Sequence, residues 1–266
     1  MFITLADGSV NTLTNGSGFV AIDDNKVDGV IFSKDDITLN GEGSLTITSP
    51  DANGIVGKDE VTITGGTYDI TAAKHAIEGK DSIAVSGGVF TLSAGEDGLH
   101  SENDDDETLG NIYITGGTFV ITVGDDAIHA NTLLQIDGGT LTITAAEGLE
   151  ATYVQINGGD ISISATDDGV NAAHKSSVYT PTFEMNDGTL TVVMGAGDTD
   201  GIDSNGNIVI NGGTINVTGN STFDYDGTAQ YNGGTIIVNG QQIDYIPNQM
   251  MGGGMIGNGG MGGRRP

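Results

Sequence analysis

The stretch that decides the fold is DGGTLTITAAEGLEATYVQI at residues 137–156, followed at once by NGGDISISATDDGVNAA at residues 157–173. Each segment has a glycine corner, an alternating apolar run, a polar corner with acidic residues and glycine, and then another apolar residue. The same order recurs at residues 64–85 and 115–136. Alternation with a period of two is typical of β-strands that bury one face. Its recurrence at short intervals predicts a solenoid.

The glycine corner sets the length of one coil. Its second glycine falls at positions 43, 66, 88, 117, 139, 159, 188, 213 and 234, in steps of 20 to 29 residues. The short steps hold three strands and three corners, whereas a propeller blade needs four strands and roughly 40 residues. We therefore predict an all-β fold, a single-stranded right-handed parallel β-helix (solenoid) of about nine coils with three strands per coil, its hand following from the crossover rule.

Stacked coils should align like residues in ladders. The short third strand has one inward residue per coil, and the predicted column is Val30, Ile55, Ile77, Leu99, Ile128, Leu149, Val170 and Ile202. The corner before it carries a polar column, which we predict as Asp28, Asn53, His75, Asp97, Asp126, Glu147, Asp168, Asp200 and Asp226. The two 29-residue steps indicate loop insertions, at residues 101–111 and 173–182.

The ends of the chain differ from the repeats. Residues 1–27 are less regular and are expected to form an N-terminal cap or first irregular coil, because the open end of a solenoid exposes its apolar cross-section. Residues 28–246 are predicted to form the parallel β-helix. Residues 247–266 are rich in Gly and Met and are predicted to be a flexible tail.

Composition narrows the functional classes. The 266 residues include 45 Gly, no Cys and no Trp, and 36 acids against 8 bases give a net charge of −28. Such a charge repels a phosphate backbone, so we expect no nucleic-acid partner. We expect no membrane insertion, because no apolar run approaches the roughly 20 residues of a membrane span. We also expect a monomer. The start, MFITLADGS, lacks the features of a signal peptide.

Acidic residues recur at the polar corner, where stacking would place carboxylates of neighbouring coils about 5 Å apart. Calcium bridging successive coils would stabilise such a ladder, although Asp also suits tight corners without any metal. We favour calcium. The predicted metal ligands are Asp97, Asp125, Asp126, Glu147, Asp167 and Asp168, with a second group of Asp198, Asp200 and Asp203 and a third in the first insertion, Asp104, Asp105 and Asp106.

Two histidines, His100 and His129, occupy one column a single coil apart. With Glu150 they could hold a transition metal, although stacked histidines are more often plain ladder residues. Sugar binding usually requires exposed aromatic and polar side chains. The predicted carbohydrate-binding residues are Tyr113, Tyr153, Tyr179, Lys175, His100 and His129.

Several segments together resemble one known family. They are ITLADGSVNTL at 3–13, SKDD at 33–36, the GKD corners at 57–59 and 79–81, SENDDDETLG at 101–110 before IYITGGTF, and GGTLTITA at 138–145. These segments resemble the carbohydrate-binding, polysaccharide-lyase-like β-helix proteins of cellulolytic Gram-positive bacteria, over residues 2–240. The resemblance implies an extracellular or cell-surface protein that binds polygalacturonate-type acidic sugars and cellulose, with calcium along the helix.

The resemblance places the calcium ligands among the acidic corners, foremost Asp97, Asp126 and Asp168. The chain departs from the family pattern at Ala76, Ala127 and Ala146, and it has His75 where an acid is expected.

Three functional hypotheses follow. The first is a non-catalytic, calcium-dependent binder of plant cell-wall polysaccharide, in which the ion supplies positive charge for an acidic glycan. The second is a pectate-like lyase, which needs a basic residue to abstract a proton; its candidates are Lys175 and Lys80. The third is a structural or adhesive surface rod without a glycan ligand. Lys and Arg are absent between Lys80 and Lys175, which favours the binding protein over the lyase.

Overall fold

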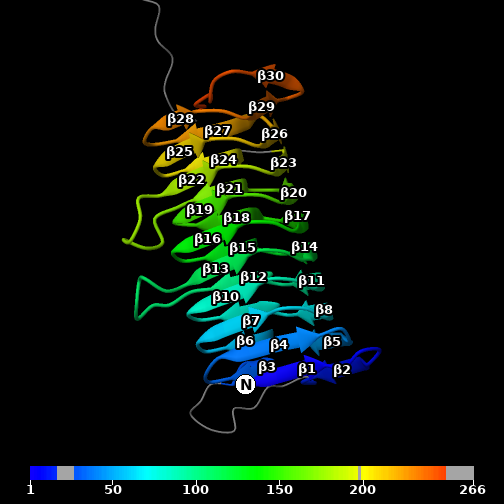
Figure 1. Cartoon of the computed structure of the whole chain (residues 1–266). Coiled ribbons are helices and arrows are strands. Elements are labelled where there is room, and N and C mark those ends of the chain that lie inside the picture. The colour runs from blue at the N-terminus through cyan, green and yellow to red at the C-terminus, as the bar shows by residue number, and fades with distance from the viewer. Residues whose placement is uncertain (17–26, 197–198, 250–266) are drawn as a thin grey trace, which may run out of the picture.

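The computed structural model describes residues 1–16, 27–196 and 199–249, and three sheets run along the whole length of the rod that they form (Figure 1). Every regular element in these residues is a β-strand. Each coil contributes one strand to each sheet. The sheets are called sheet 1, sheet 2 and sheet 3, and they contain β1, β2 and β3 respectively.

The strands of each sheet follow at intervals of one coil. Sheet 1 contains β1 (Phe2–Leu5), β4 (Ile37–Gly41), β7 (Glu60–Ile63), β10 (Ser82–Val85), β13 (Asn111–Ile114), β16 (Leu133–Ile136), β19 (Tyr153–Ile156), β22 (Thr182–Met185), β25 (Asn207–Ile210) and β28 (Ala229–Tyr231). Sheet 2 contains β2 (Val10–Thr14), β5 (Ser44–Ser49), β8 (Thr67–Ala72), β11 (Val89–Ala94), β14 (Thr118–Val123), β17 (Thr140–Ala145), β20 (Asp160–Ala165), β23 (Thr189–Met194), β26 (Thr214–Thr218), β29 (Thr235–Val238) and β30 (Gln241–Ile243). Sheet 3 contains β3 (Gly29–Ser33), β6 (Asn53–Gly57), β9 (Ile77–Gly79), β12 (Leu99–Ser101), β15 (Asp126–Ala130), β18 (Glu147–Ala151), β21 (Asp168–Ala172), β24 (Asp200–Ser204) and β27 (Ser221–Tyr225).

Each strand pairs in parallel with its equivalents in the neighbouring coils, as β14 does with β11 and β17. The exception is β30, which pairs antiparallel with β29 at the C-terminal end. The nine strands of sheet 3 correspond to nine coils. This arrangement confirms the predicted parallel β-helix with three strands per coil.

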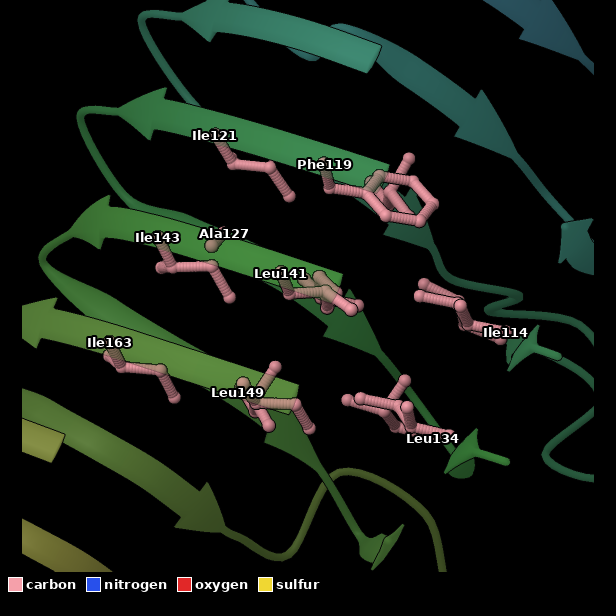
Figure 2. Close-up of a cluster of buried hydrophobic side chains, with 14 of the residues drawn as sticks. Ile114, Phe119, Ile121, Ala127, Leu134, Leu141, Ile143, Leu149 and Ile163 are labelled. Carbon is pink, nitrogen blue, oxygen red and sulfur yellow. The ribbon is translucent and has the colours of Figure 1, made fainter. Parts of the chain in front are cut away.

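The core is a set of ladders inside the rod (Figure 2). In sheet 2, Phe119 pairs with Leu141 and Ile121 pairs with Ile143, so like side chains stack from coil to coil. One ladder is aromatic: the ring of Phe90 stacks on Tyr68 at 5.2 Å and on Phe119 at 4.5 Å. These rings are almost completely buried. Offset or parallel aromatic stacking adds to the stabilisation that burial of their apolar area provides.

The glycine corner joins sheet 1 to sheet 2. The second glycine of the pair adopts positive φ, for example +105° at Gly139, a conformation that glycine adopts without steric cost. A Cβ at Gly139 would also lie 3.0 Å from the carbonyl oxygen of Gly117 one coil away. The close stacking of corners therefore favours glycine for two reasons, and this explains why glycine recurs at this corner.

The predicted columns are wrong in the first and last coils. In the first coil Gly29 and Ile31 pair with Asn53 and Ile55, so the corner residue is Gly29 and not Asp28, and the inward residue is Ile31 and not Val30. A Cβ at position 29 would lie 2.7 Å from Val56 Cγ2, so the backbone packs where a side chain was expected.

In the last coil Ser221 pairs with Asp200, and Phe223 takes the inward position opposite Ile202. The predicted corner residue Asp226 instead follows β27, at the junction with sheet 1. Asp226 was assigned to the wrong corner because an Asp-Gly pair suits both the corner before sheet 3 and the corner after it.

The two ends close differently. Residues 1–14 supply β1 and β2, which continue sheets 1 and 2, while Phe2 and Val10 are more than 80% exposed. At the other end Gln249 accepts hydrogen bonds from the backbone N–H and hydroxyl of Thr222, at 2.6 and 2.8 Å. Residues 17–26 of the predicted cap and 250–266 of the predicted tail lie outside the described residues. Within the described residues, no helix is long and apolar enough to cross a membrane.

Candidate functional site

Two insertion loops lie on one edge of the rod, where sheet 3 passes into sheet 1 (Figure 1). Residues 102–110 join β12 to β13, and residues 173–181 join β21 to β22. The loops contact each other across the coils between them. The hydroxyl of Ser176 donates to the carbonyl oxygen of Glu107 at 2.8 Å, and the backbone N–H of Ser177 donates to the Glu107 carboxylate at 3.1 Å.

The intervening coils fix both loops. The hydroxyl of Thr132 donates to the Glu107 carbonyl oxygen at 2.7 Å, and Thr152 Oγ1 accepts from the backbone N–H of Ser176 at 2.8 Å. Loops held at this many points need little ordering when a ligand binds. The second loop extends toward two faces, because its Lys175 contacts a residue of sheet 3 and its Tyr179 packs against a residue of sheet 1.

The first candidate surface, called the tyrosine face, is the outer side of sheet 1 between the two loops. Every second side chain of a strand points outward, and these side chains form two columns across the sheet. Leu133 pairs with Tyr153 in the first column, and Tyr113 pairs with Gln135 in the second. The second column continues through Gln155 and Glu184. From β13 to β22 the face extends over three strand spacings, about 14 Å. The tyrosine face thus combines aromatic rings with amide groups and one carboxylate.

Contacts on the tyrosine face hold its side chains in place. The rings of Tyr153 and Tyr179 meet edge to face, with centroids 5.3 Å apart. The hydroxyl of Tyr153 donates to the Glu184 carboxylate, which also accepts from the amide of Gln155 at 3.2 Å. Leu133, Tyr153, Gln155 and Tyr179 line a hollow of about 290 Å³. Burial raises the pKa of Tyr153 well above its ordinary value, so its hydroxyl stays protonated and available as a donor.

The second candidate surface, called the acidic groove, lies where sheet 2 passes into sheet 3. It is a hollow of about 320 Å³ that combines acidic corner residues, outward residues of sheet 3 and one residue of the second loop. Its lining is His75, Glu96, Asp97, His100, Asp125, Asp126, His129, Glu147, Glu150 and Lys175. Pairing aligns His100, His129 and Glu150 in one column. The groove therefore brings together most of the first predicted metal group and both predicted histidines.

Positive charge inside the groove comes from the chain itself. His129 Nδ1 lies 2.8 Å from Asp126 and 2.7 Å from Glu150, and Lys175 Nζ lies 2.9 Å from Glu150. Burial lowers the pKa of His129, but its hydrogen bonds to the two carboxylates outweigh burial and raise the value to about 10. His129 and Lys175 are therefore cationic at neutral pH and neutralise part of the acidic cluster.

Three carboxylates in the middle of the groove converge. Oxygen atoms of Asp126, Glu147 and Glu150 all lie within 4.8 Å of one another. Burial, reinforced by neighbouring carboxylates, raises the pKa of Asp126 and of Glu147 to about 7. The amide of Asn171 donates to Glu147 at 3.0 Å and to Glu150 at 3.3 Å. Burial also acts to raise the pKa of Glu150, but its hydrogen bonds from His129 and Lys175 outweigh burial and lower it. One ionised carboxylate beside two that resist ionisation is an oxygen-only group that can accept a hard cation.

Beyond the groove the corner column continues with Asp168 and Asp200, while Asp203 follows Asn171 in the column of His100, His129 and Glu150. The backbone N–H of Asp200 donates to Asp168 Oδ1 at 3.1 Å. Burial raises the pKa of Asp168 to about 7, with further contributions from nearby aspartates, and burial likewise raises the pKa of Asp203 to about 6. The folded state therefore binds a proton here more tightly than the unfolded state does.

This column predicts a pH-dependent stability. For an acid whose pKa is raised by folding, the cost of ionisation grows from about pH 4 to about pH 7 and is complete above it. In chelator we expect Asp168→Asn to raise the melting temperature by a few degrees at pH 8, corresponding to about 1–2 kcal/mol after screening by solvent, and to change it little at pH 4. Thermal unfolding at the two pH values measures this. Asp160→Asn, at an exposed position of the same coil, controls for loss of one charge, and an equal effect at both pH values would contradict the assignment.

Other predicted metal residues lie outside the converging groups. Asp104, Asp105 and Asp106 are exposed in the first loop, where Asp105 pairs with Lys80 at 2.6 Å and Asp106 accepts from Thr108. Asp125 lines the groove at its exposed rim, and Asp167 is exposed beside Asp168. Asp198 lies outside the described residues. The structure thus separates the loop aspartates from the acidic groove, because the loop and the groove are at different corners of the coil.

The predicted carbohydrate-binding residues divide between the two surfaces. Tyr113, Tyr153 and Tyr179 belong to the tyrosine face, whereas Lys175, His100 and His129 belong to the acidic groove. Sequence reasoning missed Gln135, Gln155 and Glu184. The signal was present, because the strand before each glycine corner carries these residues at the position that Tyr113 occupies in its own coil.

Comparison with known proteins identifies the family. The family model described as carbohydrate-binding domain-containing protein matches residues 1–198 and 149–244, so the chain belongs to this family. A relative from Acetivibrio thermocellus, with the same description, is 42% identical over 72 residues. That alignment covers 26% of this chain and 25% of the relative, so the chain spans about a quarter of the relative's length. A solved structure of the polysaccharide lyase-like protein from C. thermocellum, a gadolinium derivative, is 19% identical, with a TM-score of 0.34 and coverage of 87% of this chain and 96% of the other.

Proposed function

We propose that this protein binds plant cell-wall polysaccharide without cleaving it, and that the tyrosine face holds a neutral β-glucan chain of the cellulose type. The observation that carries the proposal is the combination of Tyr113, Tyr153 and Tyr179 with Gln135 and Gln155 on one face. Aromatic rings bind the apolar face of a sugar ring, and amides hydrogen-bond to its hydroxyl groups. An extracellular or cell-surface location is part of the proposal, because that is where such a polymer occurs.

The form of the face suits an extended polymer. It is open along the rod, and the two loops that border it are fixed to each other through Glu107 and Ser176. Binding sites are commonly hollows with aromatic walls and a few placed polar groups. The hollow at Tyr153 and Tyr179 matches this description, so we assign it the strongest contact with a sugar.

The lysines argue against a lyase. A lyase base must be neutral when it abstracts a proton. Burial lowers the pKa of Lys175, but its hydrogen bond to Glu150 and the surrounding carboxylates outweigh burial and raise the value. A hydrogen bond to Asp105 raises the pKa of Lys80. Both candidate bases are therefore held in their protonated form, which favours binding without cleavage.

The proposal is tested by retention on cellulose and on polygalacturonate, each with calcium and with chelator. The same samples are assayed for the ultraviolet absorbance of an unsaturated uronate product. We expect retention on cellulose in chelator and no rise in absorbance. A steady rise would show a lyase, and absence of retention on both polymers would leave the structural rod.

A second binding mode is favoured by the carboxylate trio Asp126, Glu147 and Glu150. We propose that calcium binds there, because calcium takes several oxygen ligands and the trio offers them within 4.8 Å. Calcium held at the groove would supply positive charge for the carboxylates of polygalacturonate. His129 and Lys175 already contact Glu150, so they would have to yield part of their interaction with this residue.

The calcium proposal predicts a selective loss. Glu147→Gln should lower calcium affinity by at least about tenfold, because one ionisable oxygen ligand is replaced by an amide. Binding to cellulose should be unchanged, since Glu147 belongs to a different sheet from the tyrosine face. Calorimetric titration with calcium measures the first effect. Calcium affinity equal to that of the wild type would rule out the trio as the binding site.

A further inference from the structure

Three side chains at the N-terminal end of the acidic groove converge on one point. His75 precedes β9, Asp97 precedes β12, and His100 lies within β12. Asp97 Oδ2 lies 3.1 Å from Nδ1 of His75 and 2.7 Å from Nδ1 of His100. The two imidazole rings stack with centroids 4.1 Å apart. Asp97 is 4% exposed, so a buried carboxylate oxygen faces two ring nitrogens from neighbouring coils.

The other nitrogen of each histidine also faces a carboxylate. His75 Nε2 lies 3.2 Å from Glu96, and His100 Nε2 lies 3.5 Å from Glu102. This is the arrangement found around metal-binding histidines, whose second nitrogen usually donates to a carboxylate that fixes the tautomer and the ring orientation. It occurs here on both histidines. The outer carboxylates are an observation independent of His75, Asp97 and His100, and they also indicate a metal site.

We propose that His75, Asp97 and His100 bind a divalent transition-metal ion of the zinc class. A tetrahedral ion with bonds of about 2.0–2.1 Å needs donor atoms about 3.3 Å apart. The Nδ1 to Oδ2 distances of 3.1 and 2.7 Å require only a small expansion. Imidazole nitrogen favours zinc, copper and nickel over calcium, which prefers oxygen. The site therefore differs in its chemistry from the carboxylate trio.

At His100 the ion would replace the proton that Nδ1 shares with Asp97 Oδ2. When Nε2–H of His75 faces Glu96, its Nδ1 accepts from the backbone N–H of Asp97 at 3.3 Å, and the ion would displace this long hydrogen bond. Binding of the metal then releases protons. The histidine side chains are 17% and 15% exposed, which leaves access from the groove, and solvent completes the coordination.

The test uses the whole chain, freed of metal by chelation. Titration with Co²⁺ should give the visible absorption bands of a nitrogen-bound, tetrahedral ion, and added Zn²⁺ should abolish them. Calorimetry should show that His75→Gln and His100→Gln each lower Zn²⁺ affinity by at least about tenfold. Glu96→Gln, which removes only the outer partner of His75, should lower it by about 10–100-fold.

The matched control is Glu147→Gln, which belongs to the carboxylate trio and contributes no atom to the proposed zinc-class site. It should lower calcium affinity and leave Zn²⁺ affinity unchanged. The histidine variants should lower Zn²⁺ affinity and leave calcium affinity unchanged. A Co²⁺ spectrum identical to that of the aqueous ion would overturn the proposal, and so would Zn²⁺ affinity that both histidine variants retain. The Co²⁺ spectrum needs no variant, so the result does not depend on whether a substituted chain folds. The tyrosine face is not involved, so failure here leaves the glycan proposal untouched.

Discussion

Replacing Phe119 with alanine is expected to lower the free energy of unfolding by about 3–5 kcal/mol. The side chain is completely buried in the core (Figure 2). It ends the aromatic ladder that runs from Tyr68 through Phe90. Its removal leaves a cavity bounded by rigid strands, because each neighbour is fixed by pairing with the coils on both sides. The melting temperature should fall by roughly 10 °C for a chain of this size.

The control for Phe119 is the next residue. Val120 lies on the same strand but points outward and is 46% exposed, so Val120→Ala should cost less than about 1 kcal/mol. Thermal and denaturant unfolding of the two variants measures the difference. Equal losses for both would contradict the closed core and its inward ladders.

Replacing Tyr153 with alanine is expected to weaken binding of a cello-oligosaccharide by about 30-fold or more, which corresponds to about 2 kcal/mol. Tyr153 lies at the centre of the tyrosine face, packs against Tyr179 and lines the hollow between the two loops. Aromatic residues at the centre of a binding surface usually carry much of the affinity. Calorimetric titration with cellohexaose measures the loss.

Two further variants separate the causes. Tyr153→Phe retains the ring but loses the hydrogen bond to Glu184, so it should weaken binding by about tenfold at most. Tyr245→Ala removes a tyrosine that is 59% exposed outside the tyrosine face, and it should leave the affinity unchanged. If Tyr245→Ala weakens binding as strongly as Tyr153→Ala, the sugar does not lie on this face.

The sequence was sufficient to predict the repeat and its inward ladders, because burial of one strand face and the glycine corners both impose a strict local pattern. The positions of Phe119, Ile121 and their equivalents follow directly from alternation. Register in the first coil did not follow, because the Val56 side chain leaves no room for a Cβ at the corner position, which Gly29 occupies. Such contacts depend on how coils stack, which a single repeat does not specify.

The candidate site was predicted only in part. Alignment of the repeats placed Asp97, Asp126 and Glu147 in one column, and the structure brings them into one groove. The alignment also placed Tyr113 and Tyr153 on the strand before the glycine corner, but it could not show that Tyr179 of the second loop packs against Tyr153. The contact between Glu107 and Ser176 joins residues 69 positions apart. No local pattern indicates a contact of that range.

The sequence did not predict that His75 and His100 stack on each other. Spacing alone placed His100 above His129, as the register confirms, but His75 occupies the corner column and stacks on His100 from there. A contact between two different columns becomes visible only when the width of the corner is known. The assignment of metals and sugars to these residues stays a prediction until the titrations are made.

The most direct test of the account is calorimetric titration of the wild-type protein and the Tyr153→Ala, Tyr179→Ala double variant with cellohexaose in the presence of chelator. We expect the wild type to bind cellohexaose without any metal and the double variant not to bind it. Binding that disappears from the wild type in chelator, or that persists in the double variant, would contradict the claim that the tyrosine face holds the glycan.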